Sequence, residues 1–385
     1  MDEIKELTYW MAVAHLPRWT TERINRLIIS VIHQQQMTWS DYFSLEIDDM
    51  QDIFKMQEKE ADSIMSTKKD LARLSFLVEQ LLNEGYQIIP INSPAYSSVL
   101  KENLKIKSSP PVLYLKGKKK LLQEQAVAIV GSRKAGNSAL KFTDNVAKNS
   151  VKNGKIVVSG FAKGVDQQAL ESALEAGGKS IIVLPQGIMT FKSGYKKYYQ
   201  KIVNGEVLVL STFFPQASWS VGLAMARNVY IYGLANEIYV AESDSKGGTW
   251  EGVNNGLKRG RIIYVRVPEK SEKNANQLLV NQGAVPVDYS GKPVAALANT
   301  ALSKSTVKNL IEESKGDYTE DNLKQEDIFE LLAKGSFTVK EIKSKTGIGW
   351  DTRKLARYLN KNPDVKQVAG NPKKYTIINS GSLFL

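Results

Sequence analysis

Two short stretches, residues 126–133 and 156–166, constrain the fold of this chain more than any other part of it. Each is a run of small and β-branched apolar residues that ends at a glycine, places a cation within three residues of it and opens into a helical pattern. N–H groups at a helix start attract anions, and glycine lets a phosphate approach the backbone closely. Two such turns predict strand–turn–helix units that bind a phosphate-rich ligand.

Composition limits the class of protein. The 385 residues are too many for one ordinary core and indicate two or three domains. There is no cysteine, which excludes disulfides and thiolate metal sites and is typical of a reducing cytosol. The N-terminal sequence lacks the apolar core of a signal peptide, and no apolar run approaches the roughly 18 residues needed to span a bilayer. We expect a soluble, cytoplasmic protein that does not associate with a membrane.

The formal net charge of +12 is unevenly distributed. Residues 1–90 carry −6, residues 91–299 carry +14 and residues 300–385 carry +4. The excess therefore lies in the part of the chain that contains both glycine turns. Localised positive charge attracts polyanions, although a merely soluble basic protein would look the same from charge alone.

Periodicity divides the chain into four segments. Residues 1–85 show apolar spacings of three and four and predict a small helical, SAM-like module. Residues 86–289 alternate short β-branched runs with helical patterns, which predicts a Rossmann-like, largely parallel sheet with helices on both faces. The expected strands are Gln87–Ile91, Pro111–Leu115, Val127–Val130, Ile156–Ser159, Ile181–Leu184, Glu206–Leu210, Ile238–Ala241 and Ile262–Val267. Ligands of such sheets bind beyond the C-terminal strand ends, where both glycine turns fall.

The C-terminal part of the chain reads differently. Residues 290–323 are rich in Ser, Ala, Thr, Lys and Asn and predict a linker. Residues 324–385 pattern as three helices followed by a hairpin, which predicts a winged-helix domain. Cations lie on its third helix and on its hairpin. Such domains bind duplex DNA or dock proteins, and the sequence leaves that choice open.

The first glycine turn is Gly131-Ser132-Arg133. It lacks the second glycine of a dinucleotide loop, and no Lys-Ser/Thr pair follows Gly136 as a Walker loop requires. What remains is a phosphate cradle made of the amides after Gly131, the Ser132 hydroxyl and the forked Arg133 guanidinium. Gly131 alone could also simply permit the turn, but that leaves the adjacent arginine unexplained.

The second glycine turn contains Gly160, Lys163 and Gly164. Lys163 lies between two glycines and suits a phosphate. Asp166 is predicted to be the N-cap of the following helix rather than a catalytic group. Phe161 is expected to fill the core more readily than to stack on a base.

Two later loops complete the predicted groove. They contain Arg227-Asn228 and Gly247-Gly248-Thr249, the second again between a strand and a helix. Both histidines, His15 and His33, lie in the N-terminal module, so no histidine base and no His/Cys metal cluster serves the groove. Carboxylates such as Glu242 and Glu251 remain as catalytic candidates, although either could simply pair with nearby cations. We expect no catalytic residue, no metal and no cofactor.

With these residues in view, the chain resembles the DNA-processing protein A (Smf) family from about Tyr86 to Pro268. The motifs that carry the resemblance are Tyr96-Ser-Ser-Val-Leu100, Pro110–Gly117, Val127–Arg133, Ser159–Asp166 with Ala173-Leu174, Arg227-Asn228, Gly247–Trp250 and Gly260-Arg261. The chain departs from the family pattern at Leu170 (usually His), at Phe191-Lys192 (usually Tyr-Pro), at Thr212 (usually acidic) and at Val229 (usually Arg).

The resemblance implies a dimeric Rossmann-like protein that binds single-stranded DNA without cutting it and helps to load a RecA-type recombinase. It places Gly131, Ser132, Arg133, Lys163, Gly164, Arg227, Asn228 and Gly248 along the DNA pocket. Two alternatives remain. Gly247–Glu251 partly resembles the loop of nucleoside-monophosphate phosphoribohydrolases, which would make the chain an enzyme, and a nucleotide-sensing module on the same fold is a third interpretation.

Overall fold

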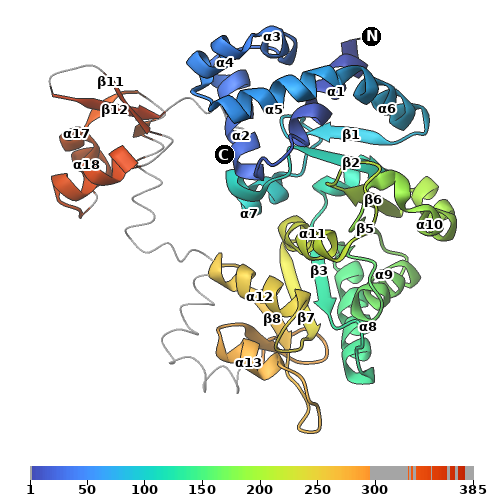
Figure 1. The fold of residues 1–385 in the computed structure, drawn as a ribbon. Helices are drawn as coiled ribbons and strands as arrows, with labels where there is room; N and C mark the ends of the chain where they lie inside the picture. The colour runs from blue at the N-terminus through green and yellow to red at the C-terminus, as the bar shows by residue number, and fades with distance from the viewer. Residues whose placement is uncertain are drawn as a thin grey trace. The chain divides into compact units, whose positions relative to one another are not determined.

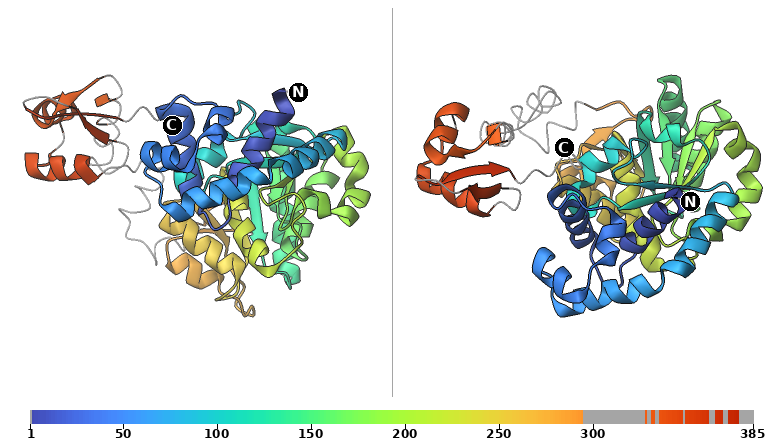
Figure 2. Two further views of the ribbon diagram at one scale, coloured as in Figure 1. Left: turned by 45° about the horizontal axis from the view of Figure 1, so that its top comes forward. Right: turned by 90° about the horizontal axis from the view of Figure 1, so that it is seen from above.

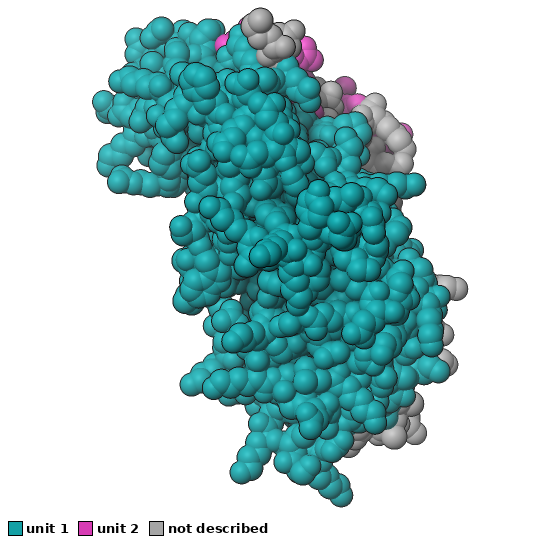
Figure 3. Space-filling model, turned by 90° about the vertical axis from the view of Figure 1, so that its right-hand side faces the viewer, with its two compact units in different colours: residues 1–26, 43–303, 384–385 teal, residues 27–42, 304–383 magenta. Residues whose placement is uncertain are grey.

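A computed structural model describes residues 2–294, 328, 331–332, 335–347, 349–361, 365–368 and 372–377. The chain divides into two compact units, residues 1–26, 43–303 and 384–385 in the first and residues 27–42 and 304–383 in the second (Figure 3). Most of the predicted linker, from residue 295 onward, lies outside the described residues.

The N-terminal segment is helical, as its apolar spacing predicts. Its elements are α1 (Asp2–Ala14), α2 (Thr21–Ile28), the π-helical turn η1 (Ile29–Gln34), α3 (Trp39–Ser44), α4 (Ile47–Phe54), α5 (Glu58–Lys69) and α6 (Leu71–Asn83). α1 and α6 pack against each other, and α1 also contacts the first two strands of the sheet. At that contact Nε2 of the partly buried His15 and the Tyr114 hydroxyl share a 2.8 Å hydrogen bond.

A nine-stranded sheet forms the centre of the first unit, in the order β1-β2-β6-β5-β4-β3-β7-β8-β9. Its strands are β1 (Gln87–Pro90), β2 (Val112–Lys116), β3 (Ala126–Gly131), β4 (Ile156–Ser159), β5 (Ser180–Val183), β6 (Val207–Ser211), β7 (Glu237–Glu242), β8 (Ile263–Arg266) and β9 (Val285–Val287). All eight predicted strands are present, with their ends displaced by at most one residue. β9 was not predicted.

The sheet is largely parallel, as predicted. β1 and β2 pair antiparallel, and β2 pairs antiparallel with β6. All other pairs, from β6 across to β9, are parallel. The chain winds outward from β3 through β4, β5 and β6, then returns to β7 on the other side of β3 and continues to β9. The strand order thus reverses between β3 and β7, and a crevice opens at such a switch point in doubly wound sheets.

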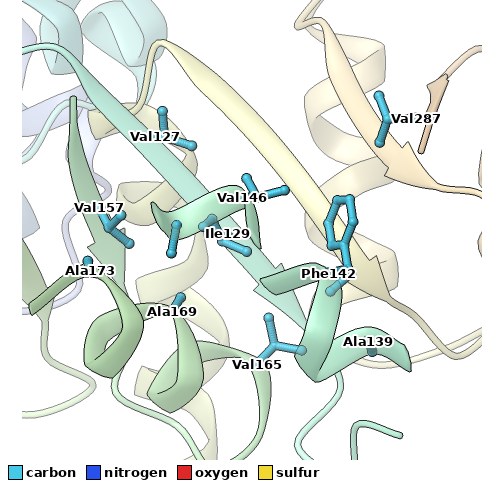
Figure 4. Packing of buried hydrophobic residues seen from close by; sticks show 12 residues of the cluster. Val127, Ile129, Ala139, Phe142, Val146, Val157, Val165, Ala169, Ala173 and Val287 are labelled. Carbon is cyan, nitrogen blue, oxygen red and sulfur yellow. The ribbon is translucent and has the colours of Figure 1, made fainter. Parts of the chain in front are cut away.

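Helices cover both faces of the sheet (Figures 1 and 2). α8 (Asn137–Lys152) and α9 (Val165–Glu175) pack on one face, where their apolar side chains meet those of β3 and β4. Figure 4 shows this core, with Phe142, Val146 and Ala169 facing Val127, Ile129 and Val157. α11 (Val221–Leu234) and α12 (Gly248–Lys258) pack together on the other face, and α7 (Ser98–Ser108) packs on α11.

Two further helices complete the parallel part. α10 (Lys192–Asn204) connects β5 to β6, and α13 (Asn276–Asn281) connects β8 to β9. Because right-handed crossovers are the rule, the reversal of winding at β3 places helices before and after it on opposite faces. In the described parts of the chain, no helix has both the length and the apolar character to cross a membrane.

In the second unit, α17 (Val339–Thr346) and α18 (Thr352–Lys361) accompany a three-stranded sheet in the order β10-β12-β11. Its strands are β10 (Phe337–Thr338), β11 (Val365–Val368) and β12 (Lys374–Ile377). Thr338 and Glu341 cap α17 reciprocally. The predicted hairpin strands are therefore present, whereas the tip of the hairpin and most of the first predicted helix lie outside the described residues, so the winged helix stays a prediction.

Candidate nucleic-acid interface

A pocket of about 460 Å³ lies at the switch point between β3 and β7, and we call it the anion pocket. Residues after β3, β4 and β7 line it together with residues of α11. From the predicted site it contains Gly131, Ser132, Arg133, Arg227, Asn228, Gly247, Gly248 and Thr249. Gly160, Lys163 and Gly164 do not line it, although Ala162 and Asp166 of the same turn do.

The two glycine turns interlock. A Cβ atom at Gly131 would lie 2.6 Å from a methyl group of Val165, and one at Gly164 would overlap the Ser132 carbonyl oxygen. Gly164 also has a φ of +79°, which L-residues rarely adopt. The Val165 N–H donates to the Ser132 carbonyl oxygen at 3.3 Å. Glycine is required here because the β3 and β4 turns pack directly on each other.

Only some of the backbone N–H groups after Gly131 are free to bind a phosphate, whereas the sequence interpretation assigned all of them to the phosphate cradle. The Ser132 N–H donates to the Glu242 carbonyl oxygen at 2.9 Å, and the Ser132 hydroxyl accepts the Lys134 N–H at 3.0 Å. The Gly136 N–H, at the start of α8, donates to the Glu242 carboxylate at 3.2 Å. A carboxylate of the protein therefore already occupies the N-terminus of α8, and side-chain cations must supply more of the attraction for an anion.

Asp166 is not an N-cap, contrary to prediction. Gly164 occupies that position, and Asp166 lies buried in the first turn of α9. Its carboxylate lies 3.9 Å from the Arg227 guanidinium. Burial raises the pKa of Asp166, while the positive charges of Arg227 and Arg133 and hydrogen bonds from backbone N–H groups act in the opposite direction.

Arg227 occupies the floor of the anion pocket. Its side chain is almost fully buried, and burial lowers its pKa while Asp166 raises it. A guanidinium nitrogen donates to the carbonyl oxygens of Gly160 and Val183, the second at 3.1 Å. A Cβ atom at Gly160 would overlap this guanidinium. Arg227 therefore ties the ends of β4 and β5 together rather than presenting its charge to solvent.

Four cations around the anion pocket are exposed. Arg133 and Lys134 follow β3, Lys163 follows β4 and Lys246 follows β7. Within the described parts of the chain, none of the four forms an ion pair. Lys134 and Lys246 line the pocket but were not among the predicted site residues; their closeness to the glycine turns was the available signal.

Phe161 packs as the sequence favours. Its ring makes edge contacts with Phe191 and Tyr198 at centroid distances of 5.2 and 5.6 Å, and it does not line the anion pocket. Its φ of +59° is unusual for a bulky residue. This strained conformation turns the chain between β4 and Lys163.

The described residues offer little for catalysis or metal binding around the anion pocket. Neither histidine lines it, and no group of His, Asp and Glu side chains suited to a metal ion occurs in the described ranges. Glu242 is engaged with Gly136, and Glu251 lies in a neighbouring groove. Asp166 and Asp244 are the carboxylates that line the pocket.

The fold and the site together define an α/β protein with a cationic pocket at the switch point of a doubly wound sheet, where glycine-containing turns form part of the pocket wall. The family model for DNA recombination-mediator protein A matches residues 87–297. The chain belongs to this family, as its resemblance to DNA-processing protein A indicates.

Individual relatives agree with this assignment. The DNA processing protein DprA of Streptococcus pneumoniae is 33% identical over 159 residues, which is 41% of this chain and 56% of that protein. The protein Smf of Synechocystis is 28% identical over 256 residues, 61% of this chain and 63% of that protein. The chain thus spans less than two thirds of these two relatives. The X-ray structure of the pneumococcal DprA superimposes with a TM-score of 0.60 and 24% identity, covering 78% of this chain and 98% of that one, which supports the fold.

Proposed function

We propose that this protein binds single-stranded DNA at the anion pocket without cleaving it, and acts as a recombination mediator that helps to load a RecA-type recombinase. The observation that carries the proposal is the convergence of Arg133, Lys134 and Lys246 on one pocket at the switch point, with Lys163 on the adjoining turn. Unpaired cations hold a phosphate backbone without reading sequence.

The residues of the predicted site divide into two roles in this proposal. Arg133 and Lys163 contact phosphates directly, as do the backbone of Gly248 and the side chain of Thr249 at the start of α12. Gly131, Gly160, Gly164 and Arg227 fix the shape of the turns. Asn228, whose side-chain amide donates to the Gly248 carbonyl oxygen at 3.3 Å, positions the β7 turn.

The first test is binding of a fluorescent oligonucleotide by the full chain, measured by anisotropy across salt concentrations. We expect single-stranded DNA to bind more tightly than duplex, with affinity that falls steeply with salt. The Arg133→Ala, Lys163→Ala variant should bind weakly and show a smaller salt slope. The control is Lys152→Ala with Lys258→Ala, which removes the same charge from the exposed ends of α8 and α12. Equal affinity of the two double variants would place the DNA elsewhere.

The mediator and dimer parts of the proposal need separate measurements. Light scattering during size-exclusion chromatography should give the mass of a homodimer. Strand exchange by a RecA-type recombinase on DNA coated with single-strand-binding protein should start sooner when this protein is added. A protein that binds DNA yet leaves the recombinase unaffected would limit the function to DNA binding.

The enzyme alternative is tested by incubation with AMP and chromatography for released adenine. Glu251 would have to act as the catalytic carboxylate, yet it lines the groove beside the anion pocket rather than the pocket itself. We therefore expect no release of base.

A further inference from the structure

Glu242, the last residue of β7, closes the start of α8 beside the anion pocket. Its carboxylate accepts the Gly136 N–H at 3.2 Å, and Gly136 is the N-cap of this 16-residue helix. A helix that begins at the switch point of a doubly wound sheet commonly binds a phosphate there, because its first N–H groups have no partner within the helix. In this chain a carboxylate takes that place.

The main chain of Glu242 holds this carboxylate in position. Glu242 pairs with Gly131 in the β3–β7 ladder, and its carbonyl oxygen accepts the Ser132 N–H at 2.9 Å. A Cβ atom at Gly136 would lie 3.5 Å from the carboxylate, so the side chain lies close against the end of the same turn. Glu242 is therefore bound to the β3 turn on both sides of Arg133, and its negative charge stays next to the cations that attract phosphate.

The charge of Glu242 is not neutralised by a neighbouring cation. In the part of the chain that the structure describes, it forms no ion pair, and neither does the exposed Asp244, which lines the anion pocket. The third carboxylate, Asp166, is paired with Arg227. Glu242 is also half-buried, whereas Arg133 is exposed, so solvent and salt screen the carboxylate less than they screen the cation.

The charge of a phosphate depends on its place in a strand. A phosphodiester within a strand carries one negative charge, whereas a free nucleotide or a phosphorylated strand end is a monoester with a charge of about −1.5 to −2 at pH 7. Repulsion from a fixed carboxylate grows in proportion to that charge. A monoester would also present more oxygen acceptors to the start of α8, where Glu242 already engages the Gly136 N–H.

We propose that Glu242 makes the anion pocket selective for phosphodiesters within a strand and disfavours phosphate monoesters, both free nucleotides and phosphorylated ends. The inference rests on the proposed function, because it concerns the phosphate that the anion pocket holds. Glu242 acts through its charge and does not contact the DNA. As a consequence, free nucleotides compete poorly with single-stranded DNA for the pocket.

The test uses two competitors that differ by one methyl group. Thymidine monophosphate is a monoester, and its methyl ester is a diester with one negative charge. Each is titrated into the full chain bound to a fluorescent oligothymidylate, and anisotropy gives its inhibition constant. The methyl ester should compete about tenfold more tightly. In Glu242→Gln, whose amide oxygen can still accept the Gly136 N–H, thymidine monophosphate should gain most of this factor while the methyl ester changes little.

The control is Glu175→Gln, which removes the same charge at the exposed end of α9 away from the pocket. It should keep the ratio of the parent chain. A merely structural role of Glu242 would weaken both competitors alike, so the ratio isolates the effect of charge. Failure of the methyl ester to compete, equal inhibition by the two ligands, or an unchanged ratio in Glu242→Gln would overturn the inference. Failure of the oligothymidylate itself to bind would instead remove the proposed function.

Discussion

Arg227 and Asp166 form a buried ion pair, 3.9 Å apart, beneath the anion pocket. The pair connects α11 to the first turn of α9, and Arg227 also donates to backbone oxygens at the ends of β4 and β5. A charge in this position is stable only while its partners remain, because burial removes the water that would otherwise solvate it.

Replacing Arg227 with Met should therefore lower the free energy of unfolding by about 3 to 5 kcal/mol, since it leaves the Asp166 carboxylate buried without its cation. Urea unfolding followed by tryptophan fluorescence measures the change. The double variant Arg227→Met, Asp166→Asn should recover part of the loss, because the uncompensated charge is gone. A double variant less stable than Arg227→Met alone would show that the carboxylate is stabilised by groups other than Arg227.

Asn276 supports the β7 turn from outside the pocket. It is fully buried, its side-chain amide donates to the carbonyl oxygens of Ala241 and Arg266, and its carbonyl oxygen accepts the Ser243 N–H at 2.9 Å. Asn276→Ala should destabilise the protein by about 2 to 3 kcal/mol, because three buried backbone groups each lose a hydrogen bond, although the Ala241 oxygen keeps the one from Arg266 Nε at 2.9 Å. It should also weaken oligonucleotide binding, since Ser243 precedes the turn that contains Lys246.

The comparison for this prediction is Asn281→Ala, at an exposed asparagine on the same helix. Its unfolding curve should match that of the parent. If Asn276→Ala loses stability but keeps full affinity, the β7 turn does not depend on this support for binding.

His15 should make stability depend on pH. Burial lowers the pKa of His15 from 6.5 to about 4. Between these pH values the imidazole is protonated in the unfolded chain but stays neutral in the folded one. Stability contributed by the neutral ring is complete above pH 6.5 and falls as the pH drops toward 4. The loss between pH 6.5 and 5 should be about 1.5 kcal/mol. Urea unfolding at both pH values measures it.

His15→Gln isolates this effect, because glutamine keeps a hydrogen-bonding group near the Tyr114 hydroxyl but does not titrate. The difference in stability between pH 6.5 and 5 should shrink in this variant. An unchanged difference would assign the pH dependence to other groups, among them His33, whose pKa burial also lowers.

The strands from β1 to β8 could be read from the sequence because each is a compact β-branched run with a clear end. β9 could not be predicted, because it is only three residues long and has Pro286 at its centre. Only its pairing with β8 makes this segment a strand. The location of the anion pocket followed from the two glycine turns, since parallel strands bring their C-terminal ends to one edge.

The use of individual groups at the site was harder to predict. Whether a backbone N–H is free depends on a partner from a distant strand, and Glu242 of β7 engages two of the amides that the sequence assigned to phosphate. The family pattern places Arg227 along the DNA pocket, and nothing local in the sequence reveals that its side chain is buried and donates to the Gly160 carbonyl oxygen in the β4 turn. The family pattern assigns these residues to one DNA pocket, but it does not separate those that line the anion pocket from those that hold the turns.

Gly164 provides the strictest test of the interlocked turns. Gly154 has a nearly equal φ, +71° against +79°, but a Cβ atom there would meet nothing within 4 Å, whereas at Gly164 it would overlap the Ser132 carbonyl oxygen. Gly154→Ala should therefore lower the free energy of unfolding by about 1 kcal/mol, the cost of holding an L-residue at a positive φ. Gly164→Ala adds a collision with the β3 turn and a larger backbone cost, because its ψ of −126° lies outside the left-handed helical region, so it should destabilise the protein further and also move Arg133, which lowers affinity for single-stranded DNA. Urea unfolding measures the loss of stability in both variants, and anisotropy measures whether Arg133 has moved. Equal losses of stability, with unchanged DNA affinity in Gly164→Ala, would mean that the β3 turn can move aside and that its packing on β4 does not set the position of Arg133.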